Sequence, residues 1–450
     1  MRTRIEAIAL VLGLGVGATA CGDFLTGPKL GDNPNQPLTA TDANLLVSAQ
    51  TSMTGLQEGH LARTLCVWLQ QCSGPLRDFN DLSLYIVGDD DYFIEWKQVY
   101  TRGGLKDLRT IQSRALAAGD SGFAGVAAVL EAWAIGFAAD AWGDVPYSEA
   151  LDTTNATPVL DPQQGVYAAA QAKLDDAIAY LGASSTGTSV AVDLIYGGDL
   201  AKWSALANTL KARFHLHTAE QLGQPAYQAA FDAAQNGITD PSGAGDYRNY
   251  HSGASVEANL WFQFTVQWVG FLAAGKQLVD QLQTAGDPRL SQYFAPNSQG
   301  DFVGAAPGEG PEVLPSDVNP ARLNPTFRQP IVTYVENQLI LAETAWQLAG
   351  GGGAGNAAAQ PYVSAERSAL GLGPLAVTGL ETIMTEKYAV LFQNFEAWSD
   401  YRRTCIPALA PAAGSAAIPA RVVYPLSERN ANASIPDGGP LTNWNDPNGC

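Results

Sequence analysis

Basic residues are scarce in this chain of 450 residues, which holds 25 Lys and Arg against 44 Asp and Glu and has a formal net charge of -19. Such a charge repels a nucleic-acid backbone or an anionic lipid surface, so we expect no nucleic-acid partner. Neutral ligands fit it better. Only 15% of the residues are charged and 46% are hydrophobic, which is typical of a folded globular protein and not of a disordered one.

Histidine is also rare, with four in the whole chain. His215 and His217 lie two positions apart, which points them to different faces of a helix and makes them poor joint metal ligands. We therefore expect no metal site. The chain also lacks a P-loop, a G-x-S-x-G elbow and a dinucleotide-binding fingerprint, so we expect no cofactor. Paired carboxylates of a glycoside hydrolase are defined by their separation in space, and the sequence does not exclude them.

The N-terminus has the pattern of an export signal. Two arginines precede an apolar run at residues 8–16, and small residues lead to Cys21 in "GATACGDFL". This predicts a lipoprotein signal peptide at residues 1–20, lipidation of Cys21 and a mature domain at 21–450. A large aliphatic residue is usual three positions before a lipidated cysteine, where this chain has Ala18, so cleavage that leaves Cys21 as a plain thiol stays an alternative. No second apolar run reaches the roughly 20 residues that span a bilayer, so we expect membrane contact through a lipid anchor.

The other four cysteines are Cys66, Cys72, Cys405 and Cys450, an even number that suits an oxidising compartment and permits three pairings. On a continuous helix, Cys66 and Cys72 would lie about 9 Å apart along the axis. That is too far for a disulfide. A bond between them needs the helix to break, and "CSGPL" at 72–76 supplies such a break.

Most long segments have helical period, as in "FAGVAAVLEAWAIGF", whose large apolar residues recur at spacings of three and four. Strand-like alternation is scarce, so the sequence predicts a mainly α protein. "AGGGGAGNAA" at 349–358 is predicted to form a flexible tip between two helices. Helices are expected near 41–57, 91–118, 123–137, 162–181, 199–222, 257–284, 331–348 and 380–398, with long loops at 72–90, 236–256, 286–328 and 404–450.

A series of motifs runs in order along residues 21 to 432. It consists of "CGDFL", "DNPNQPLTATDANLL", "YFIEWKQVYTRGGLKDL", "AWGDVPYSEAL", "GDPRLSQYF", "YVENQLILAETAWQLAG", "EKYAVLFQNFEAWSDYRRT" and "IPARVVYPLSERNAN". Together these motifs resemble the SusD/RagB family, surface lipoproteins that bind nutrients for outer-membrane TonB-dependent transporters. The last residues, "GPLTNWNDPNGC", match no motif of that family.

The resemblance implies a single α-helical domain without catalytic activity. Four helix-turn-helix units similar to tetratricopeptide repeats would form its scaffold, and long loops would build the ligand surface. It also implies that Cys21 is the lipidated cysteine, that the protein is anchored by lipid at the cell surface of the outer membrane, and that a SusC-type transporter is its partner. The lipoprotein would close over the transporter barrel like a lid. A strict 34-residue repeat consensus is absent from the sequence.

Ligand sites of the family are built largely from the segment before the "EWKQVY" helix and from later loops, but they share no motif that transfers residue by residue. We therefore select candidates by composition, because aromatic faces stack on sugar C–H surfaces and amides bind hydroxyl groups. Trp261 and Trp268 are seven positions apart and would share a helix face, so core packing is an alternative for them. The predicted ligand-binding residues are Trp68, Gln71, Asn80, Tyr85, Tyr92, Trp261 and Trp268.

The leading hypothesis is a lipid-anchored binding protein that captures an oligosaccharide, or a peptide, and hands it to a transporter. A secreted glycan-cleaving enzyme with paired carboxylates is an alternative of another class. A helical-repeat scaffold with only protein partners is a third.

The segment "AADAWGDVPYSEALD" at 138–152 is dense in carboxylates and aromatic residues, as an active site would be. It directly follows a predicted helix, and its Gly-Pro pattern predicts a turn. We interpret it as a structural corner in which Trp142 and Tyr147 are anchored by burial. Asp140, Asp144 and Glu149 would accept hydrogen bonds from backbone N–H groups of the loop and of neighbouring helix starts.

Overall fold

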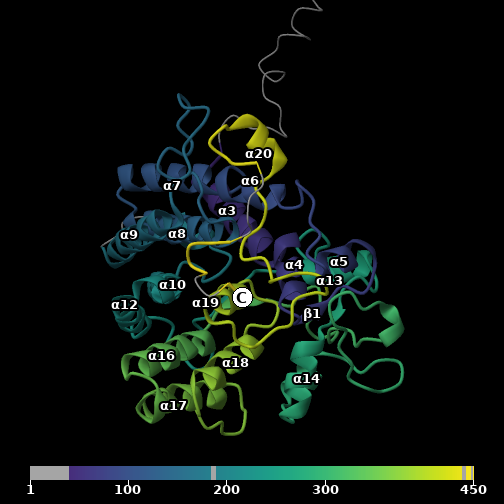
Figure 1. Cartoon of the computed structure of the whole chain (residues 1–450). Coiled ribbons are helices and arrows are strands. Elements are labelled where there is room, and N and C mark those ends of the chain that lie inside the picture. The colour runs from purple at the N-terminus through teal and green to yellow at the C-terminus, as the bar shows by residue number, and fades with distance from the viewer. Residues whose placement is uncertain (1–39, 184–188, 438–441, 447–448) are drawn as a thin grey trace, which may run out of the picture. The chain divides into compact units, whose positions relative to one another are not determined.

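Helices make up most of the described chain, which confirms the mainly α class (Figure 1). The structure is a computed structural model that describes residues 40–183, 189–437, 442–446 and 449–450. The predicted signal peptide and Cys21 lie outside these residues.

The chain divides into two compact units, Met1–Asn44 and Leu45–Cys450. In the described part of the first unit, the backbone N–H of Asn44 donates to Thr41 Oγ1. Everything below concerns the second unit.

The long helices pack side by side in series, with α7 against α8, α8 against α9, α9 against α10, α10 against α12, and α12 against α16. Helix α16 packs against both α17 and α18. Figure 1 shows this series descending from α7 to α17. The arrangement confirms the predicted scaffold of tetratricopeptide-like helix-turn-helix units. The bounds are α7 (Leu105–Ala117), α8 (Ser121–Trp142), α9 (Gln163–Gly182), α10 (Leu200–His217), α12 (Gln224–Ala234), α16 (Tyr334–Leu348), α17 (Gly352–Ala369) and α18 (Leu380–Val390).

Shorter elements surround this series. Strands are minimal: β1 (Cys72–Ser73) pairs with β3 (Ala273–Ala274), and β2 (Tyr247–Arg248) pairs with β4 (Pro330–Val332), both antiparallel. The remaining helices are α3 (Asp42–Glu58), α4 (His60–Trp68), α5 (Arg77–Ser83), α6 (Phe93–Tyr100), α11 (Ala219–Leu222), α13 (Leu260–Gln267), α14 (Lys276–Thr284), α15 (Arg289–Tyr293), α19 (Glu396–Thr404) and α20 (Leu426–Ala431), with 3-10 turns η1 (Ser189–Val192) and η2 (Pro311–Val313).

Helix α8 is the centre of the core, and nearly all of its residues are buried. Among the described residues it is the one helix that is long and apolar enough to span a membrane, although we expected no such run after the signal peptide. Every residue of its apolar window is buried inside the protein. Helix α8 is apolar on every face because other elements of the protein surround it, as is usual for a core helix in a large domain.

Four predicted helices are each divided in the structure. The segment 199–222 forms α10 and α11, and the segment 380–398 forms α18 and the start of α19. The segment 91–118 forms α6 and α7, because Gly103 has a φ of 83° and an added Cβ at Gly104 would lie 2.0 Å from the carbonyl oxygen of Val99. The segment 257–284 forms α13 and α14, with strand β3 between them. The predicted glycine-rich tip at 349–358 is also shorter than expected, because α17 already begins at Gly352.

The corner at 138–152 has the structural role that the sequence predicted, although Tyr147 is half-buried and its hydroxyl donates to Glu131 Oε1 at 3.1 Å. Trp142 is fully buried and its Nε1 donates to the carbonyl oxygen of Val423 at 3.1 Å. Asp144 Oδ1 accepts from the backbone N–H of Gln163, the first residue of α9, at 2.7 Å. Glu149 Oε2 accepts from the backbone N–H of Val159 at 3.1 Å.

Asp140 differs from this expectation, because its carboxylate is bound by side chains instead of backbone N–H groups. The hydroxyl of Tyr167 donates to Asp140 Oδ1 at 2.6 Å, and Arg402 Nη2 lies 3.3 Å from the same oxygen. Its position inside α8, where the backbone N–H groups bond within the helix, explains the difference.

A chain of buried ions, here called the scaffold network, joins the helices around Asp140. His217 of α10 has its Nδ1 3.0 Å from Asp140 Oδ1 and its Nε2 2.7 Å from Glu396 Oε1 of α19. Glu396 Oε2 lies 3.2 Å from Arg213 Nε, and Arg213 pairs with Glu336 of α16 at 2.7 Å. Burial lowers the pKa of His217, but the two adjacent carboxylates outweigh this effect and hold it at about 9. The scaffold network therefore contains a protonated histidine at neutral pH.

The "EKYAVLFQNFEAWSDYRRT" segment supplies further buried ions beside the scaffold network. Lys387 Nζ donates to Asp400 Oδ1 at 2.9 Å, and Arg403 pairs with both Asp400 and Glu343 of α16. Lys387 and Arg403 together hold the pKa of Asp400 at about 2, although burial opposes this. The charged residues of this motif thus fasten α18 and α19 to the helix series.

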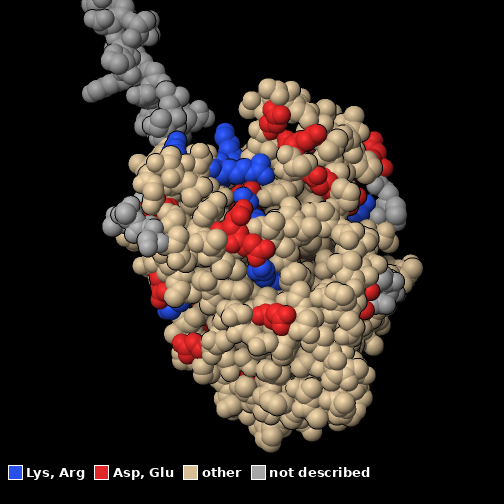
Figure 2. Space-filling model, turned by 90° about the vertical axis from the view of Figure 1, so that its left-hand side faces the viewer, with Lys and Arg blue, Asp and Glu red and all other residues tan. Residues whose placement is uncertain are grey.

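Charges on the helix side of the molecule are mixed. Figure 2 shows acidic and basic side chains interspersed in the upper part of this face, with few charges below. No broad basic area is visible among the residues drawn there, in agreement with the low content of Lys and Arg.

Candidate ligand-binding surface

A disulfide lies where the chain turns back at the end of α4, next to the candidate site. Cys66 and Cys72 are bonded, with their Cα atoms 5.1 Å apart. The helix ends at Trp68, earlier than the predicted break at 72–76, and Gln70 takes a left-handed φ of 56°. The other pair is Cys405 with Cys450, which settles the three pairings left open by the sequence.

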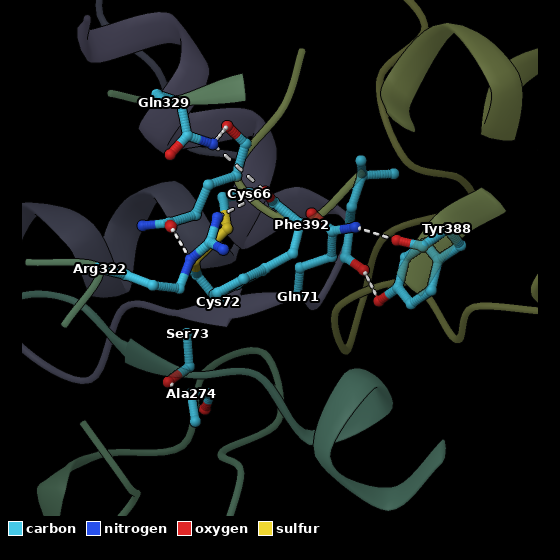
Figure 3. The surroundings of a disulfide bond; sticks show 11 residues. Cys66, Gln71, Cys72, Ser73, Ala274, Arg322, Gln329, Tyr388 and Phe392 are labelled. Carbon is cyan, nitrogen blue, oxygen red and sulfur yellow. Dashed lines mark hydrogen bonds between the residues drawn. A yellow bond between two sulfur atoms is a disulfide. The ribbon is translucent and has the colours of Figure 1, made fainter. Parts of the chain in front are cut away.

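Polar contacts hold the disulfide segment against α18 (Figure 3). Gln71 Nε2 donates to the carbonyl oxygen of Tyr388 at 2.7 Å, and the Tyr388 hydroxyl donates to the carbonyl oxygen of Leu69 at 2.7 Å. Near the disulfide, Arg322 Nε donates to Gln393 Oε1 at 2.9 Å. The two bonds from Leu69 and Gln71 to Tyr388 fix the backbone that precedes α5.

Strand pairing then brings two distant segments together. Cys72 is opposite Ala274 and Ser73 is opposite Ala273, and the Ser73 hydroxyl donates to the carbonyl oxygen of Ala274 at 2.9 Å. The segment that leaves α13 is therefore held beside the start of α5. Figure 1 shows α4, α5, α13 and β1 as one group.

Four aromatic rings meet at this junction and are called the aromatic surface below. Phe79 of α5 has its ring centroid 4.9 Å from that of Phe264 on α13 and 6.4 Å from that of Phe271. The Trp268 centroid lies 5.3 Å from that of Phe271. Phe79 is buried and forms the base, whereas Trp268 is 50% exposed. Its neighbour Val269 is 78% exposed, so the exit of α13 presents apolar area to solvent.

One cation supports the base of the aromatic surface. The guanidinium of Arg63 lies 4.6 Å from the centre of the Phe264 ring, and Arg63 Nη1 donates to the carbonyl oxygen of Glu58. Burial lowers the pKa of Arg63 to about 10, so it stays charged at neutral pH. A cation over one face of Phe264 fixes that ring in place.

Four of the predicted ligand-binding residues are buried. Trp68 donates from Nε1 to the carbonyl oxygen of Leu82, and Gln71 bonds Tyr388 as described above. Tyr92 stacks on His60 with ring centroids 5.8 Å apart, and Trp261 is 1% exposed on α13. A ligand at the surface cannot contact a side chain without exposed area, so this structure gives these four residues packing and positioning roles.

The other three predicted residues are at least partly accessible. Trp268 belongs to the aromatic surface, and Asn80 is carried by α5, the helix that also carries Phe79. Among the described residues, no hydrogen bond joins the side-chain amide of Asn80 to a partner. Tyr85 packs edge-on against Trp68, and its hydroxyl accepts from the backbone N–H of Ala412 at 3.1 Å. Burial raises the pKa of Tyr85, so its hydroxyl stays protonated and can donate.

Phe79, Phe264 and Phe271 were not among the ligand-binding residues predicted from the sequence. A usable signal was the density of aromatic residues in "NLWFQFTVQWVGF", whose last part continues past the end of α13. Trp261 and Trp268 do not share a helix face as expected, because the helix ends at Gln267. The aromatic residues after Gln267 no longer follow the helical spacing that buries one face of a helix, and they reach the surface.

No group of three or more His, Cys, Asp or Glu side chains in the described part of the chain could hold a metal ion. Cations already bind the carboxylates of the scaffold network and its neighbours. Stacking and hydrogen bonding are what the aromatic surface can offer a ligand.

Comparison with known proteins gives one family. Residues 34–425 match the SusD-like family described as "Starch-binding associating with outer membrane". None of the curated proteins matches the sequence. A solved chitin-binding protein is 25% identical with a TM-score of 0.74, and the match covers 87% of this chain and 94% of that one.

Two further structures share the fold at lower identity. A chitin-binding SusD homologue from Flavobacterium johnsoniae is 20% identical, with a TM-score of 0.73 and coverage of 90% of this chain and 97% of that one. A SusD/RagB family protein from Bacteroides thetaiotaomicron is also 20% identical, with a TM-score of 0.71 and coverage of 88% and 95%.

Proposed function

Because the chain belongs to the SusD-like family, we propose that it is a nutrient-binding protein of the outer membrane that captures a neutral oligosaccharide on its aromatic surface. In this proposal it delivers the ligand to a SusC-type TonB-dependent transporter. The observation that carries the ligand assignment is the half-exposed indole of Trp268, supported from behind by Phe271, Phe79 and Phe264. A rigid, exposed ring of this kind suits the C–H face of a sugar.

Charge and neighbouring groups support a neutral glycan. A chain with a net charge of -19 does not favour anionic polymers. Asn80 and Tyr85, on and just after α5, add an amide and a hydroxyl that can bind sugar hydroxyl groups. The printed names of two similar structures are those of chitin-binding proteins, which favours a glycan over a peptide.

Anchoring is the second part of the proposal. Cys21 would carry the lipid after removal of residues 1–20, and the protein would stay on the cell surface beside its transporter. Replacing Cys21 with alanine should release the protein from the membrane fraction, and metabolic labelling with a fatty acid should lose its signal. Labelling that persists in Cys21→Ala, or a wild-type protein recovered free in the medium, contradicts the anchor.

We also propose that the protein does not cleave its ligand. The carboxylates of the scaffold network are held by cations in the core, which leaves them without a substrate to reach. Incubation with polysaccharides should yield no products. Product formation that is lost on mutation of one carboxylate would instead support the glycan-cleaving alternative.

The binding experiment compares variants of one ring. Isothermal titration against chito-oligosaccharides, malto-oligosaccharides and a peptide mixture identifies the ligand class. Trp268→Ala should weaken binding of the preferred glycan by about 2 kcal/mol, or roughly 30-fold, as expected for a binding hot spot. Trp268→Phe should retain part of the affinity because it keeps a ring.

Tyr250→Ala is the matched control, because Tyr250 is 37% exposed and lies outside the aromatic surface. Its affinity for the glycan should equal that of the wild type. An unchanged affinity in Trp268→Ala contradicts the proposed site, and binding of the peptide mixture alone contradicts the glycan. Co-purification of the transporter with the wild-type protein from detergent-solubilised membranes tests the partner.

A further inference from the structure

A cavity of about 240 Å³ lies at the start of α16 and shares no residue with the aromatic surface. The loop at 241–246 and the ends of α15, α17 and α18 complete its wall. Figure 1 shows α16, α17 and α18 packed together in its lower part. The volume is below the roughly 300 Å³ at which drug-sized sites begin, so the cavity suits a small ligand. Its charged lining residues are Asp246, Arg248 and Arg322.

Asp246 is the one carboxylate among the described residues that line the cavity, and both of its oxygens are already bound. Its Oδ1 accepts from the backbone N–H of Tyr334, the first residue of α16, at 2.9 Å. Its Oδ2 accepts from Arg248 Nη2 at 2.8 Å. This pairing neutralises Asp246 and Arg248 and leaves the charge of Arg322 without a partner.

The guanidinium of Arg322 is held by neutral groups. Its Nε donates to Gln393 Oε1 at 2.9 Å (Figure 3). Three ring centres each lie 5.1 Å from its Cζ, those of Tyr293, Phe327 and Phe392. Ring faces attract a cation but supply no counter-ion. Arg322 is half-buried, and its Nη1 makes no hydrogen bond to a described residue and is not closed off from solvent.

Arg248 adds to the positive charge of this cavity. Its side chain is 45% exposed, which places it at the rim. Burial and the nearby Arg248 lower the pKa of Arg322 to about 10, so Arg322 stays charged at neutral pH. Two guanidinium groups and one carboxylate give the lining a net charge of +1. A ligand with a single negative charge would balance it.

The start of α16 offers a further hydrogen-bond donor. The first N–H groups of a helix have no partner inside the helix. Asp246 accepts from that of Tyr334, and Thr333 Oγ1 accepts from that of Glu336 at 3.2 Å. The N–H of Val335, which lines the cavity, has no partner in the part of the chain that the structure describes. The positive end of the helix dipole also favours an anion here.

We propose that this cavity is a second binding site, one that takes a small molecule with a single carboxylate group, either a short organic acid or one acidic sugar unit. Arg322 Nη1 and the N–H of Val335 donate to the carboxylate, and Arg248 attracts it at the rim. A doubly charged sulfate or phosphate leaves an excess negative charge, and a neutral molecule leaves Arg322 without a counter-ion. The acidic residues elsewhere on the protein do not prevent this, because salt screens exposed charges beyond about 8 Å. The inference is independent of the proposed function.

The test uses saturation-transfer NMR on full-length protein that carries Trp268→Ala, so that sugars do not bind the aromatic surface. Glucuronate, acetate and methyl glucoside are observed directly, and methyl glucoside serves as the neutral counterpart of glucuronate. Sulfate is measured as a competitor of glucuronate. We expect glucuronate and acetate to bind, and methyl glucoside and sulfate to bind less well.

Arg322→Met is the first variant, because methionine keeps apolar contact with the three rings and removes the charge. It should weaken both carboxylate probes by at least about tenfold. Arg421→Met is the matched control. Arg421 also lies 5.1 Å from a ring centre, that of Tyr424, but it does not line the cavity. This control should leave the affinities unchanged.

Asp246→Asn is the second variant, and it decides the question if Arg322→Met does not fold. Asparagine keeps an oxygen for the N–H of Tyr334 and removes the negative charge, so the net charge of the lining becomes +2. The affinity for both carboxylate probes should rise by about threefold or more.

The two carboxylate probes also distinguish the sources of the ligand. A glucuronate affinity above that of acetate assigns the site to an acidic sugar, and an affinity no higher assigns it to a short organic acid. The inference is overturned if neither carboxylate binds, or if methyl glucoside or sulfate binds at least as well. Carboxylate affinities that Arg322→Met or Asp246→Asn leaves unchanged overturn it too.

Discussion

In the scaffold network the Asp140 carboxylate has His217, Tyr167 and Arg402 as partners and is 2% exposed, whereas on the aromatic surface the Trp268 ring is 50% exposed. The first region uses carboxylates and cations to join helices, and burial leaves them no contact with a ligand. The second region uses rings held by their neighbours and keeps one face open. Charge density thus marks the scaffold of this protein, and exposed apolar area marks the candidate site.

The largest effect that separates the two regions is expected from Asp140→Ala. Removing this carboxylate takes away the ion-pair partner of buried Arg402 and leaves His217 with Glu396 alone, which costs about 3–5 kcal/mol of unfolding free energy. Urea unfolding monitored by circular dichroism measures the loss. The protein that remains folded should bind its glycan as before. A loss below about 1 kcal/mol contradicts the structural role of the network.

The two disulfides give the next largest contrast, because one borders the candidate site and the other does not. Cys405 and Cys450 close a loop of 45 residues, and the double serine variant should lose about 4 kcal/mol of stability with no loss of affinity. Cys66 and Cys72 close a loop of 6 residues and should contribute only about 2 kcal/mol.

Loss of the Cys66–Cys72 bond should lower stability less than loss of the Cys405–Cys450 bond, but it should weaken ligand binding more. Without the Cys66–Cys72 bond, the segment that pairs with β3 is no longer held, so α5 and the exit of α13 lose their fixed positions. Calorimetric affinity and denaturant midpoints on both double variants test this order. If Cys66→Ser with Cys72→Ser binds glycan like the wild type, the disulfide does not position the aromatic surface.

A pH experiment concerns the scaffold network alone. The pKa of His217 is about 9 in the folded protein, and its ordinary value is 6.5. Between pH 6.5 and 9, His217 is therefore protonated in the folded state and deprotonated in the unfolded state. The stabilisation is fully present below pH 6.5 and is lost as the pH rises through 9. Stability should therefore fall between pH 7 and 9.5 in the wild type and fall less in His217→Gln. Equal slopes for the two proteins contradict a protonated His217.

The sequence predicted the scaffold better than the site, and particular residues explain why. Motif residues such as Glu336, Lys387 and Glu396 lie on α16, α18 and α19, so the family resemblance assigns them to the helical scaffold, whereas their ion pairs were not predicted. Trp68 and Trp268 are both tryptophans in loop-rich segments, yet one is fully buried and the other is half exposed. That difference depends on where α4 and α13 end, and helix ends are set by tertiary contacts such as the disulfide and the β1–β3 pair.

The smallest expected effects come from the corner at 138–152, whose carboxylates looked catalytic in the sequence. Asp144→Asn keeps an acceptor for the backbone N–H of Gln163 and loses only the charge near the start of α9, which is worth about 0.3–1 kcal/mol. Glu149→Gln keeps one acceptor for Val159 and should cost a similar amount. Both variants should bind the same glycans with wild-type affinity, measured by titration beside thermal melting. A change of ligand specificity at unchanged stability would move these carboxylates from the scaffold to the site and remove the distinction between the two regions.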